Sequence, residues 1–154
     1  MSRRTSQSRR QHGSAPVHKP SCPCGLAETY DACCGRFHRG EAAAPTAEAL
    51  MRSRYSAFVK LNDQYLLRTW HPGTRPATLK LDPGMRWTGL EILDTTDGSA
   101  FHGTGTVTFR ASYEGGSLLE RSRFERSETG VPPAGGWGRI EGAWVYVDGE
   151  FPEA

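Results

Sequence analysis

CPCGLAETYDACCG, residues 22–35, contains all four cysteines of this 154-residue chain. Four thiols so close together bind a metal ion, form two disulfides or carry out redox chemistry. Zn²⁺ takes four ligands in a tetrahedron, and four thiolates suit it well. We therefore predict one structural zinc site, whose ligands are Cys22, Cys24, Cys33 and Cys34.

The residues between and after these cysteines favour the tight turns that a metal knuckle needs. Pro23 has a fixed backbone angle, and Gly25 and Gly35 allow the chain to reverse. The C-x-C-x8-C-C spacing differs from that of ordinary zinc fingers, which have more residues within each ligand pair. Adjacent side chains at Cys33 and Cys34 point in different directions, so we expect the backbone to bend where both reach one ion.

Two alternatives to a metal site are less well supported by the residues. Disulfides require an oxidising compartment, and the N-terminus has no apolar signal-peptide core, so we expect reduced thiols in the cytoplasm. A thioredoxin-like site has a C-x-x-C pair near a βαβ pattern, and the chain has neither. His38 is a further candidate ligand. Because four thiolates already complete a tetrahedron, we favour a solvated histidine beside Arg36 and Arg39.

The cysteine segment resembles the SEC-C zinc knuckle, which is found at the tail of the bacterial secretion ATPase SecA and in many small bacterial proteins. The matching residues are Cys22-x-Cys24-Gly25 and Tyr30-x-x-Cys33-Cys34-Gly35. The resemblance implies that the four cysteines bind the zinc ion and that Tyr30 packs beside it. It also suggests, by analogy, a protein partner in export or translation that docks on the knuckle.

Composition and charge divide the chain into a basic tail and a mildly acidic body. Residues 1–20 carry five basic and no acidic side chains, whereas the remainder carries 14 basic and 17 acidic ones. The tail has almost no apolar side chains, so we predict that it is disordered. Its charge allows weak contacts with nucleic acid, but tight binding needs more. No apolar run approaches 18 residues, so we expect no membrane span.

Residues 46–61 form the strongest predicted helix. Thr46 is placed to cap it, and Glu48 suits the first turn. One apolar face comprises Ala47, Leu50, Met51, Tyr55, Ala57, Phe58 and Leu61. Arg54 lies in the middle of this face, where a guanidinium without a partner is costly. It either reaches the edge of the face or pairs with a buried carboxylate.

A second, shorter helix is predicted at residues 62–70, with Tyr65, Leu66 and Trp70 facing inward. Pro72 and Gly73 cannot continue a helix, so it ends there. His71 is a candidate general base at a pocket mouth. A histidine next to a helix-ending proline is more often a C-terminal cap, and we favour that interpretation.

The rest of the chain predicts four antiparallel strands, at residues 86–94, 104–113, 118–126 and 139–147, with a flexible loop at 128–138. A Gly115-Gly116 turn would pair Glu120 with Ala111 and Phe124 with Val107, which places Glu120 on the apolar face. We therefore predict an α+β fold with two or three helices packed on one face of a curved antiparallel sheet. Arg54 and Glu120 then face one interior, and we predict that they form an ion pair.

This second part resembles the YchJ-like family of uncharacterised bacterial proteins, in which an SEC-C knuckle precedes a cone-shaped domain like nuclear transport factor 2. The matching segments are Pro45-Thr46-x3-Leu50-Met51-Arg52-Ser53-Arg54-Tyr55-Ser56-Ala57-Phe58, Tyr65-Leu66, Thr69-Trp70-His71-Pro72, Ser122-Arg123-Phe124 and Tyr146-x-Asp148-Gly149. After the disordered tail at 1–20 that the composition predicts, the resemblance implies a zinc knuckle at 21–40 and a cone domain at 45–151. It implies no reaction.

We therefore expect a zinc-binding module without catalysis, which docks a protein or binds a small ligand in its cone. The alternative is a small-molecule lyase or isomerase, because similar cones house acid–base chemistry in other proteins. The candidate pocket residues are Arg54, Tyr55, Tyr65, Trp70, His71 and Glu120.

Overall fold

The computed structural model describes residues 19–127 and 142–152. Most of the predicted tail and the loop predicted at 128–138 lie outside the described residues. The described chain forms three α-helices, α1 (Cys34–His38), α2 (Ala47–Val59) and α3 (Asp63–Arg68). Four strands follow them, β1 (Trp87–Asp97), β2 (Thr104–Tyr113), β3 (Gly116–Arg126) and β4 (Trp144–Glu150). The strands pair antiparallel in the order β1-β2-β3-β4, which confirms the predicted α+β class.

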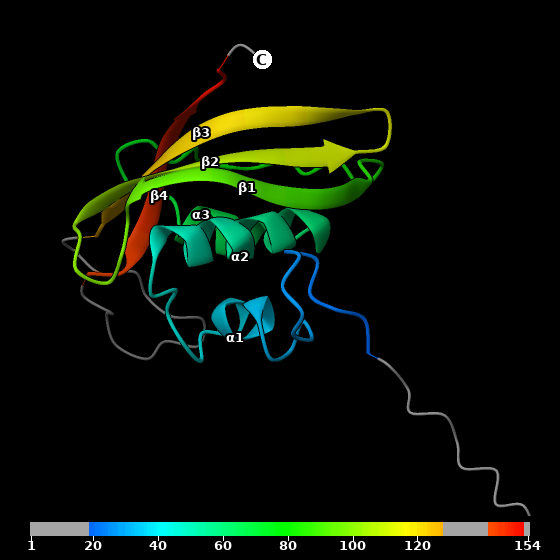
Figure 1. The fold of residues 1–154 in the computed structure, drawn as a ribbon, viewed down its shortest axis with the longest axis horizontal. Helices are drawn as coiled ribbons and strands as arrows, with labels where there is room; N and C mark the ends of the chain where they lie inside the picture. Colours follow the sequence, from blue (N-terminus) through cyan, green and yellow to red (C-terminus); the bar gives the residue numbers. More distant parts are fainter. Residues whose placement is uncertain (1–18, 128–141, 153–154) are drawn as a thin grey trace, which may run out of the picture.

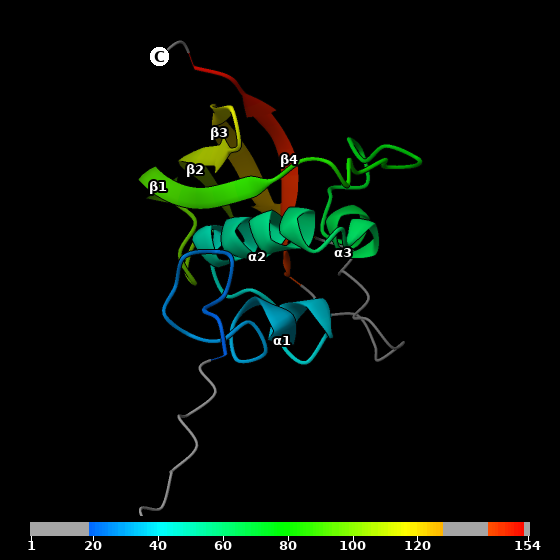
Figure 2. The same ribbon diagram turned by 90° about the vertical axis from the view of Figure 1, so that its right-hand side faces the viewer.

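The elements stack in three layers, and α2 is the middle one. Figures 1 and 2 show the curved sheet on one side of α2, and the cysteine knuckle with α1 on the other. The helix α3 lies beside α2, under the β4 side of the sheet. A helix in this position must bury side chains on more than one face. We predicted a single buried face for it.

The residues at each end of α2 explain where it begins and ends. Thr46 Oγ1 accepts a hydrogen bond from the Ala49 N–H at 3.0 Å, which confirms the predicted N-cap. Leu61 has a positive φ of 56°, which a helix cannot continue, and Asn62 then caps α3. Leu61 is 46% exposed, so its prediction as a core residue is wrong.

The two sides of α2 pack against different clusters. Leu50, Met51 and Tyr55 join Val107 and Phe109 in the core beneath the sheet. Ala57 belongs instead to a smaller cluster with Phe37, Tyr65 and Leu66, which joins α2 to α1 and α3. Ser53 and Ser56 are fully buried although they are polar. Their burial indicates that the knuckle covers that side of the helix.

The hairpin between β2 and β3 differs from its predicted register by two residues. Tyr113 pairs with Gly116, so the turn residues are Glu114 and Gly115 rather than two glycines. Gly115 adopts the positive φ that such a turn requires. Glu120 therefore pairs with Phe109. A shift of two residues leaves each side chain on the same face, so Glu120 still points inward as predicted.

The outer strands also differ from their predicted bounds. β1 continues to Asp97 through an irregularity between Ile92 and Asp94. β4 begins at Trp144 rather than at residue 139, because Ser127 and Gly142 close the preceding loop by backbone hydrogen bonds. Within the described part of the chain, no helix is long and apolar enough to cross a membrane.

Candidate metal centre and interior pocket

The four cysteine sulfurs converge at one point between the knuckle and α2. The Sγ atoms of Cys22, Cys24, Cys33 and Cys34 all lie within 4.8 Å of one another, and all four residues are buried. Cys22 and Cys24 come from a tight loop that the Gly25 N–H closes on the Cys22 carbonyl at 3.2 Å. The backbone bends at Cys33, the N-cap of α1, which has φ −120° and ψ −111°. The bend brings both adjacent cysteines to the cluster, as predicted.

The sulfur geometry fits a metal ion better than a disulfide. Cys24 Sγ and Cys33 Sγ are 3.7 Å apart. Metal–sulfur bonds of about 2.3 Å in a tetrahedron place sulfurs about 3.8 Å apart, whereas a disulfide bond is about 2.05 Å long. The donor set therefore has both the number and the spacing of ligands for a tetrahedral ion.

The four thiols strongly affect one another's pKa values because they lie so close together. Hydrogen bonds from Cys24 and Cys34 hold the pKa of Cys22 far below its usual range. Burial, with the neighbouring thiols, raises the pKa of Cys33 to about 12. The pKa of Cys34 is raised mainly by its contacts with Cys22 and Cys24. Without a cation, the cluster keeps protons to avoid gathering several negative charges in one buried place.

The cone domain contacts the cysteine loop directly through α2. Ser56 Oγ lies 3.5 Å from Cys22 Sγ, and Arg52 donates a 2.7 Å hydrogen bond to the Cys24 carbonyl. Arg52 is held in place by Glu48, one helical turn earlier on α2. The knuckle is therefore fastened to the cone at the cysteines themselves.

His38 is buried in this interface, so its prediction as a solvated residue is wrong. Its Nε2 donates to the Ser53 carbonyl at 2.8 Å, and Nδ1 accepts from the Tyr30 hydroxyl at 2.6 Å. Burial lowers the pKa of His38, which favours the neutral ring that this arrangement requires. Both ring nitrogens are engaged, so His38 is no metal ligand. Tyr30 packs beside the cysteines, as the knuckle resemblance implied.

A second candidate site lies inside the cone, between α2 and the concave face of the sheet. It is a cavity of about 80 Å³. Its polar lining consists of Arg54, Trp70, Glu120, Ser122 and Tyr146. Its apolar lining consists of Met51, Phe58 and Phe109. Three of the six predicted pocket residues meet here, namely Arg54, Trp70 and Glu120. Sequence reasoning missed Ser122 and Tyr146, although both belong to the segments that carry the family resemblance.

Arg54 is only 3% exposed, and its hydrogen bonds to described residues go to a carbonyl and a hydroxyl rather than to a carboxylate. Its Nη1 donates to the Leu66 carbonyl at 2.7 Å and to Thr69 Oγ1 at 2.8 Å. The guanidinium carbon lies 5.1 Å from the ring centre of Trp70 and 4.6 Å from that of Tyr146. Burial lowers the pKa of Arg54 to about 10, so it remains charged at neutral pH.

Glu120 faces the same cavity, but the predicted ion pair with Arg54 does not form within the described part of the chain. Its Oε1 accepts hydrogen bonds from the Tyr146 hydroxyl at 3.0 Å and from Ser122 at 3.3 Å. Burial raises the pKa of Glu120, against the opposing effect of these hydrogen bonds and of Arg54. The strand partners therefore replace Arg54 as the groups that hold this carboxylate.

Paired segments of β3 and β4 surround the Glu120 side chain. Ser122 pairs with Gly149, and Arg123 pairs with Asp148. The Arg123 guanidinium forms two hydrogen bonds of 2.6 Å with the Asp148 carboxylate on the outer face. On the inner face, a β-carbon on Gly149 would overlap the Glu120 carboxylate. Two segments that carry the family resemblance therefore hold the Glu120 side chain in place. They are Ser122-Arg123-Phe124 and Tyr146-x-Asp148-Gly149.

The other predicted pocket residues lie elsewhere. Tyr65 is hydrogen-bonded to Ser53 at 2.7 Å on the knuckle side of α2, and burial raises its pKa to about 12. Tyr55 packs edge-on against Trp87 in the main core. His71 Nδ1 accepts from the Gly73 N–H at 2.9 Å, and Nε2 lies 3.6 Å from Glu125. Neither side-chain contact is with a carbonyl at the C-terminal end of α3, so the predicted helix cap does not form among the described residues, and His71 is not part of the cavity lining either.

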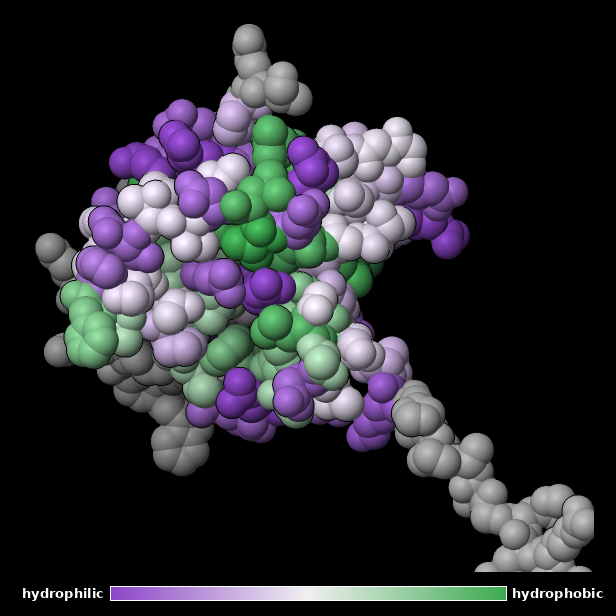
Figure 3. All heavy atoms as spheres, in the orientation of Figure 1, coloured by the Kyte–Doolittle hydropathy of each residue, from purple (hydrophilic) through white to green (hydrophobic). Residues whose placement is uncertain are grey.

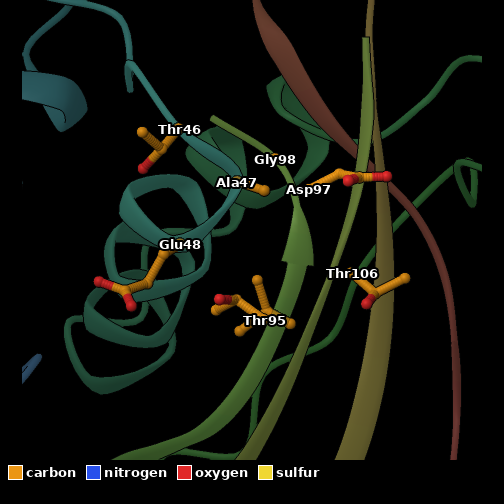
Figure 4. A pocket seen from close by; sticks show the side chains of 8 residues that line it. Thr46, Ala47, Glu48, Thr95, Asp97, Gly98 and Thr106 are labelled. Atoms are coloured by element: carbon orange, nitrogen blue, oxygen red, sulfur yellow. The ribbon is translucent and has the colours of Figure 1, made fainter. Parts of the chain in front are cut away.

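A larger hollow of about 240 Å³ lies at the N-terminal end of α2, where Thr46, Glu48, Thr95 and Asp97 are among its lining residues. Figure 4 shows that its two carboxylates point to opposite sides, Glu48 away from the sheet and Asp97 across it. Glu48 pairs with Arg52, and Asp97 lies 3.5 Å from His102. These acidic groups do not converge on a common point.

Among residues 19–127 and 142–152, few large hydrophobic side chains are exposed. Figure 3 shows a hydrophobic strip over the sheet, which polar residues separate from a second hydrophobic area over the knuckle. Leu93 of β1 is 41% exposed and Leu26 of the cysteine loop is 42% exposed. Leu26 therefore gives the knuckle an exposed apolar group.

The architecture defines a class of protein: a cone-shaped α+β domain of the nuclear-transport-factor-2 type, with a cysteine knuckle packed on its central helix. Residues 46–149 match the family model described as "YchJ, middle NTF2-like domain". The chain belongs to this YchJ family.

Known proteins resemble the chain in both its sequence and its fold. It is 72% identical over 132 residues to a UPF0225 protein of Streptomyces coelicolor, which covers 86% of this chain and 96% of that relative. A UPF0225 protein of Streptomyces avermitilis is 64% identical over 152 residues, covering 96% and 99% of the two chains.

Two solved structures share the fold, and both are described as SEC-C motif containing proteins. The solution structure from Rhodopseudomonas palustris superposes with a TM-score of 0.66 at 29% identity, covering 86% of this chain and 98% of that one. The crystal structure from Psychrobacter arcticus superposes with a TM-score of 0.65 at 25% identity, covering 86% and 83%. Each likeness covers 86% of this chain, which is more than the cone domain alone.

Proposed function

We propose that the four cysteines bind one zinc ion and that the protein is a binding module rather than an enzyme. The observation that carries the metal proposal is the convergence of four buried sulfurs within 4.8 Å of one another. An all-thiolate tetrahedron is typical of structural zinc, because a site with four protein ligands keeps no position open for a substrate.

The proposed role of the ion is to hold the knuckle in shape against α2. The knuckle has little apolar material of its own, since its cluster consists of the four cysteines with Tyr30 beside them. A segment with so small a core depends on metal binding for its folding free energy. Thiolate ligands also need reducing conditions, which supports a location in the cytoplasm.

The binding role has two parts in this proposal. The cone cavity takes a small ligand, which is supported by a charged and aromatic lining inside an otherwise apolar interior. The outer side of the knuckle docks a protein partner, which is supported by the exposed Leu26 and by the structural likeness to SEC-C motif containing proteins.

Atomic emission on the purified full-length chain tests the metal proposal. We expect one zinc per chain in the wild type and none in the Cys22→Ser, Cys24→Ser double variant. His38→Gln is the matched control, because both nitrogens of His38 are already engaged by Tyr30 and Ser53. Full zinc content in the double variant, or loss of zinc in His38→Gln, would contradict the ligand set.

Native mass spectrometry from cell lysate tests the binding role. A small molecule retained at one per chain, and lost when Arg54 and Glu120 are replaced together, supports a ligand in the cone. A retained molecule that is unaffected by those replacements would show that the cavity is not its site.

A second candidate function is acid–base catalysis on a small molecule by a lyase or isomerase. The observation that favours it is the raised pKa of Glu120 inside a cavity, an arrangement that general bases require. Carbon-13 NMR of the labelled Glu120 carboxyl group measures its pKa directly. A pKa near neutrality supports this candidate, whereas a pKa below about 5 leaves Glu120 too weak a base for it.

A further inference from the structure

The cone cavity contains hydrogen-bond donors that the described residues leave unpaired. The hydrogen bonds of the Arg54 guanidinium to described residues both start from Nη1, which leaves Nε and Nη2 without an acceptor among them. Trp70 lines the same cavity, and its Nε1 is buried with no partner in the described chain. A buried N–H without an acceptor is costly, so the indole N–H of Trp70 points to a ligand that supplies one. The Nε and Nη2 groups of Arg54 are further donors for the same ligand.

The cavity lining also includes a hydrogen-bond acceptor, the carboxylate of Glu120 on β3. The hydrogen bonds to Glu120 from Tyr146 and Ser122 both reach Oε1. Oε2 receives none from the residues that the structure describes.

Size and access restrict what fits between these groups. A cavity of about 80 Å³ holds a group of about three non-hydrogen atoms, if each takes about the 30 Å³ of a liquid water molecule. Arg54 is buried at the back, while Trp70, Glu120 and Tyr146 are partly exposed. The small group therefore enters between these three residues, and the remainder of its molecule stays outside.

The opposite charges of Arg54 and Glu120 restrict which chemical group of a ligand fits between them. A carboxylate would suit Arg54 and Trp70 but would meet the Glu120 carboxylate. An ammonium or guanidinium would suit Glu120 but would meet Arg54. A primary carboxamide has three non-hydrogen atoms in one plane, with an acceptor oxygen beside an N–H₂ donor.

We propose that the cone cavity binds the carboxamide group of a small molecule, whose oxygen accepts from Arg54 and Trp70 and whose nitrogen donates to Glu120 Oε2. This inference rests on the proposed ligand-binding role of the cone and specifies the ligand class. The rings of Trp70 and Tyr146, which meet edge-on at 5.1 Å, flank the guanidinium and hold its unpaired donors in position.

Proton–nitrogen NMR on the zinc-loaded full chain tests the proposal with small probes. The indole N–H of Trp70 is a specific reporter, because Trp144 already donates to the Pro45 carbonyl. The Trp70→Phe variant assigns its resonance. We titrate acetamide, acetate and methylguanidinium separately, and we expect a saturable downfield shift of the Trp70 resonance with millimolar acetamide only.

Two variants sharpen the test. Glu120→Gln supplies both a donor and an acceptor, so it should admit acetate and reduce the preference for acetamide at least tenfold. Glu125→Gln changes a carboxylate of the same strand that lies outside this cavity, and the preference should persist. A preserved spectrum in both variants shows that they are folded.

The outcomes separate this proposal from the broader one. A saturable response to acetate or methylguanidinium instead of acetamide overturns the carboxamide assignment and leaves a ligand-binding cone. No response to any probe overturns both the assignment and the ligand-binding role of the cavity. The zinc proposal is unaffected in each case, because its test measures metal content.

Discussion

The Glu120 carboxylate packs against the Cα of Gly149, in the space that a β-carbon at residue 149 would need. Ser122, the strand partner of Gly149, donates a hydrogen bond to the same carboxylate. A glycine in the interior of a strand normally weakens it. Here the absence of a side chain at Gly149 leaves room for the partly buried Glu120 carboxylate, which lines the cavity.

Gly149→Ala should therefore displace Glu120 and destabilise the fold by about 1–3 kcal/mol, the usual cost of forcing extra atoms into a packed site. Urea unfolding measures the change. Gly89→Ala is the control, because a β-carbon at residue 89 meets no atom within 4 Å. Its effect should stay within about 0.5 kcal/mol. Equal effects of the two substitutions would show that the space beside Gly149 is not limiting.

Glu120→Gln should change how stability depends on pH. The folded protein holds the Glu120 proton more tightly than the unfolded chain does, because burial raises its pKa above 4.5. The contribution of Glu120 to stability is thus greatest below pH 4.5 and is lost as pH rises through the folded pKa.

Glu120→Gln lacks this titration, so its stability relative to wild type should rise as pH increases over that range. Parallel denaturation curves between pH 4.5 and 8 measure the difference. Loss of metal in acid affects both proteins and cancels in the comparison. A constant difference across the range would mean that burial does not shift the pKa of Glu120.

Arg54→Ala should destabilise the protein by about 3 kcal/mol or more. The substitution leaves a cavity between two rings and removes the donor from the Leu66 carbonyl and Thr69. Arg110→Ala removes an exposed arginine that pairs with Glu91 at 3.6 Å, and it should cost less than about 1 kcal/mol. Thermal or urea unfolding compares the two, and equal losses would argue against a structural role for the buried guanidinium.

Ser56→Ala should weaken zinc binding about tenfold or more, the usual effect of removing a hydrogen bond to a metal ligand. The Ser56 hydroxyl is the contact of the cone with Cys22. Competition with a zinc-binding dye measures the affinity. Ser53→Ala is the control on the same helix, because its equally buried hydroxyl contacts Tyr65 instead. It should lower stability and leave zinc affinity unchanged, and the reverse pattern would contradict the assignment.

Several parts of the fold could be predicted because their signals are local. Strand β2 matches its predicted bounds at Thr104 and Tyr113, since strict alternation fixes both its type and its faces. The start of α2 at the Thr46 cap is another such case. The register of the next hairpin was wrong by two residues, because Gly115 and Gly116 both suit a turn and the sequence alone could not decide which of them occupies it.

The residues of the two sites and their contacts were harder to predict from the sequence. Arg54 was predicted to be inside, but its partners come from the end of α3 and from β4, which lie far apart in the sequence. Tyr146 gave no signal as a pocket residue, because an alternating strand presents many aromatic side chains. His38 was placed in solvent, since nothing in its neighbouring residues indicates that Ser53 and Tyr30 close around it.

The sequence by itself indicated that the four cysteines cluster, and it gave the order of helices and strands and the inward placement of Arg54 and Glu120. These follow from residue type, spacing and periodicity, which act over a few neighbouring residues. Only the tertiary structure decided that α2 is covered on two sides, that Ser56 contacts Cys22, and that Glu120 is held by Tyr146 rather than by Arg54. Those contacts join residues 26 or more positions apart, and the packing of whole layers, not any local preference, brings them together.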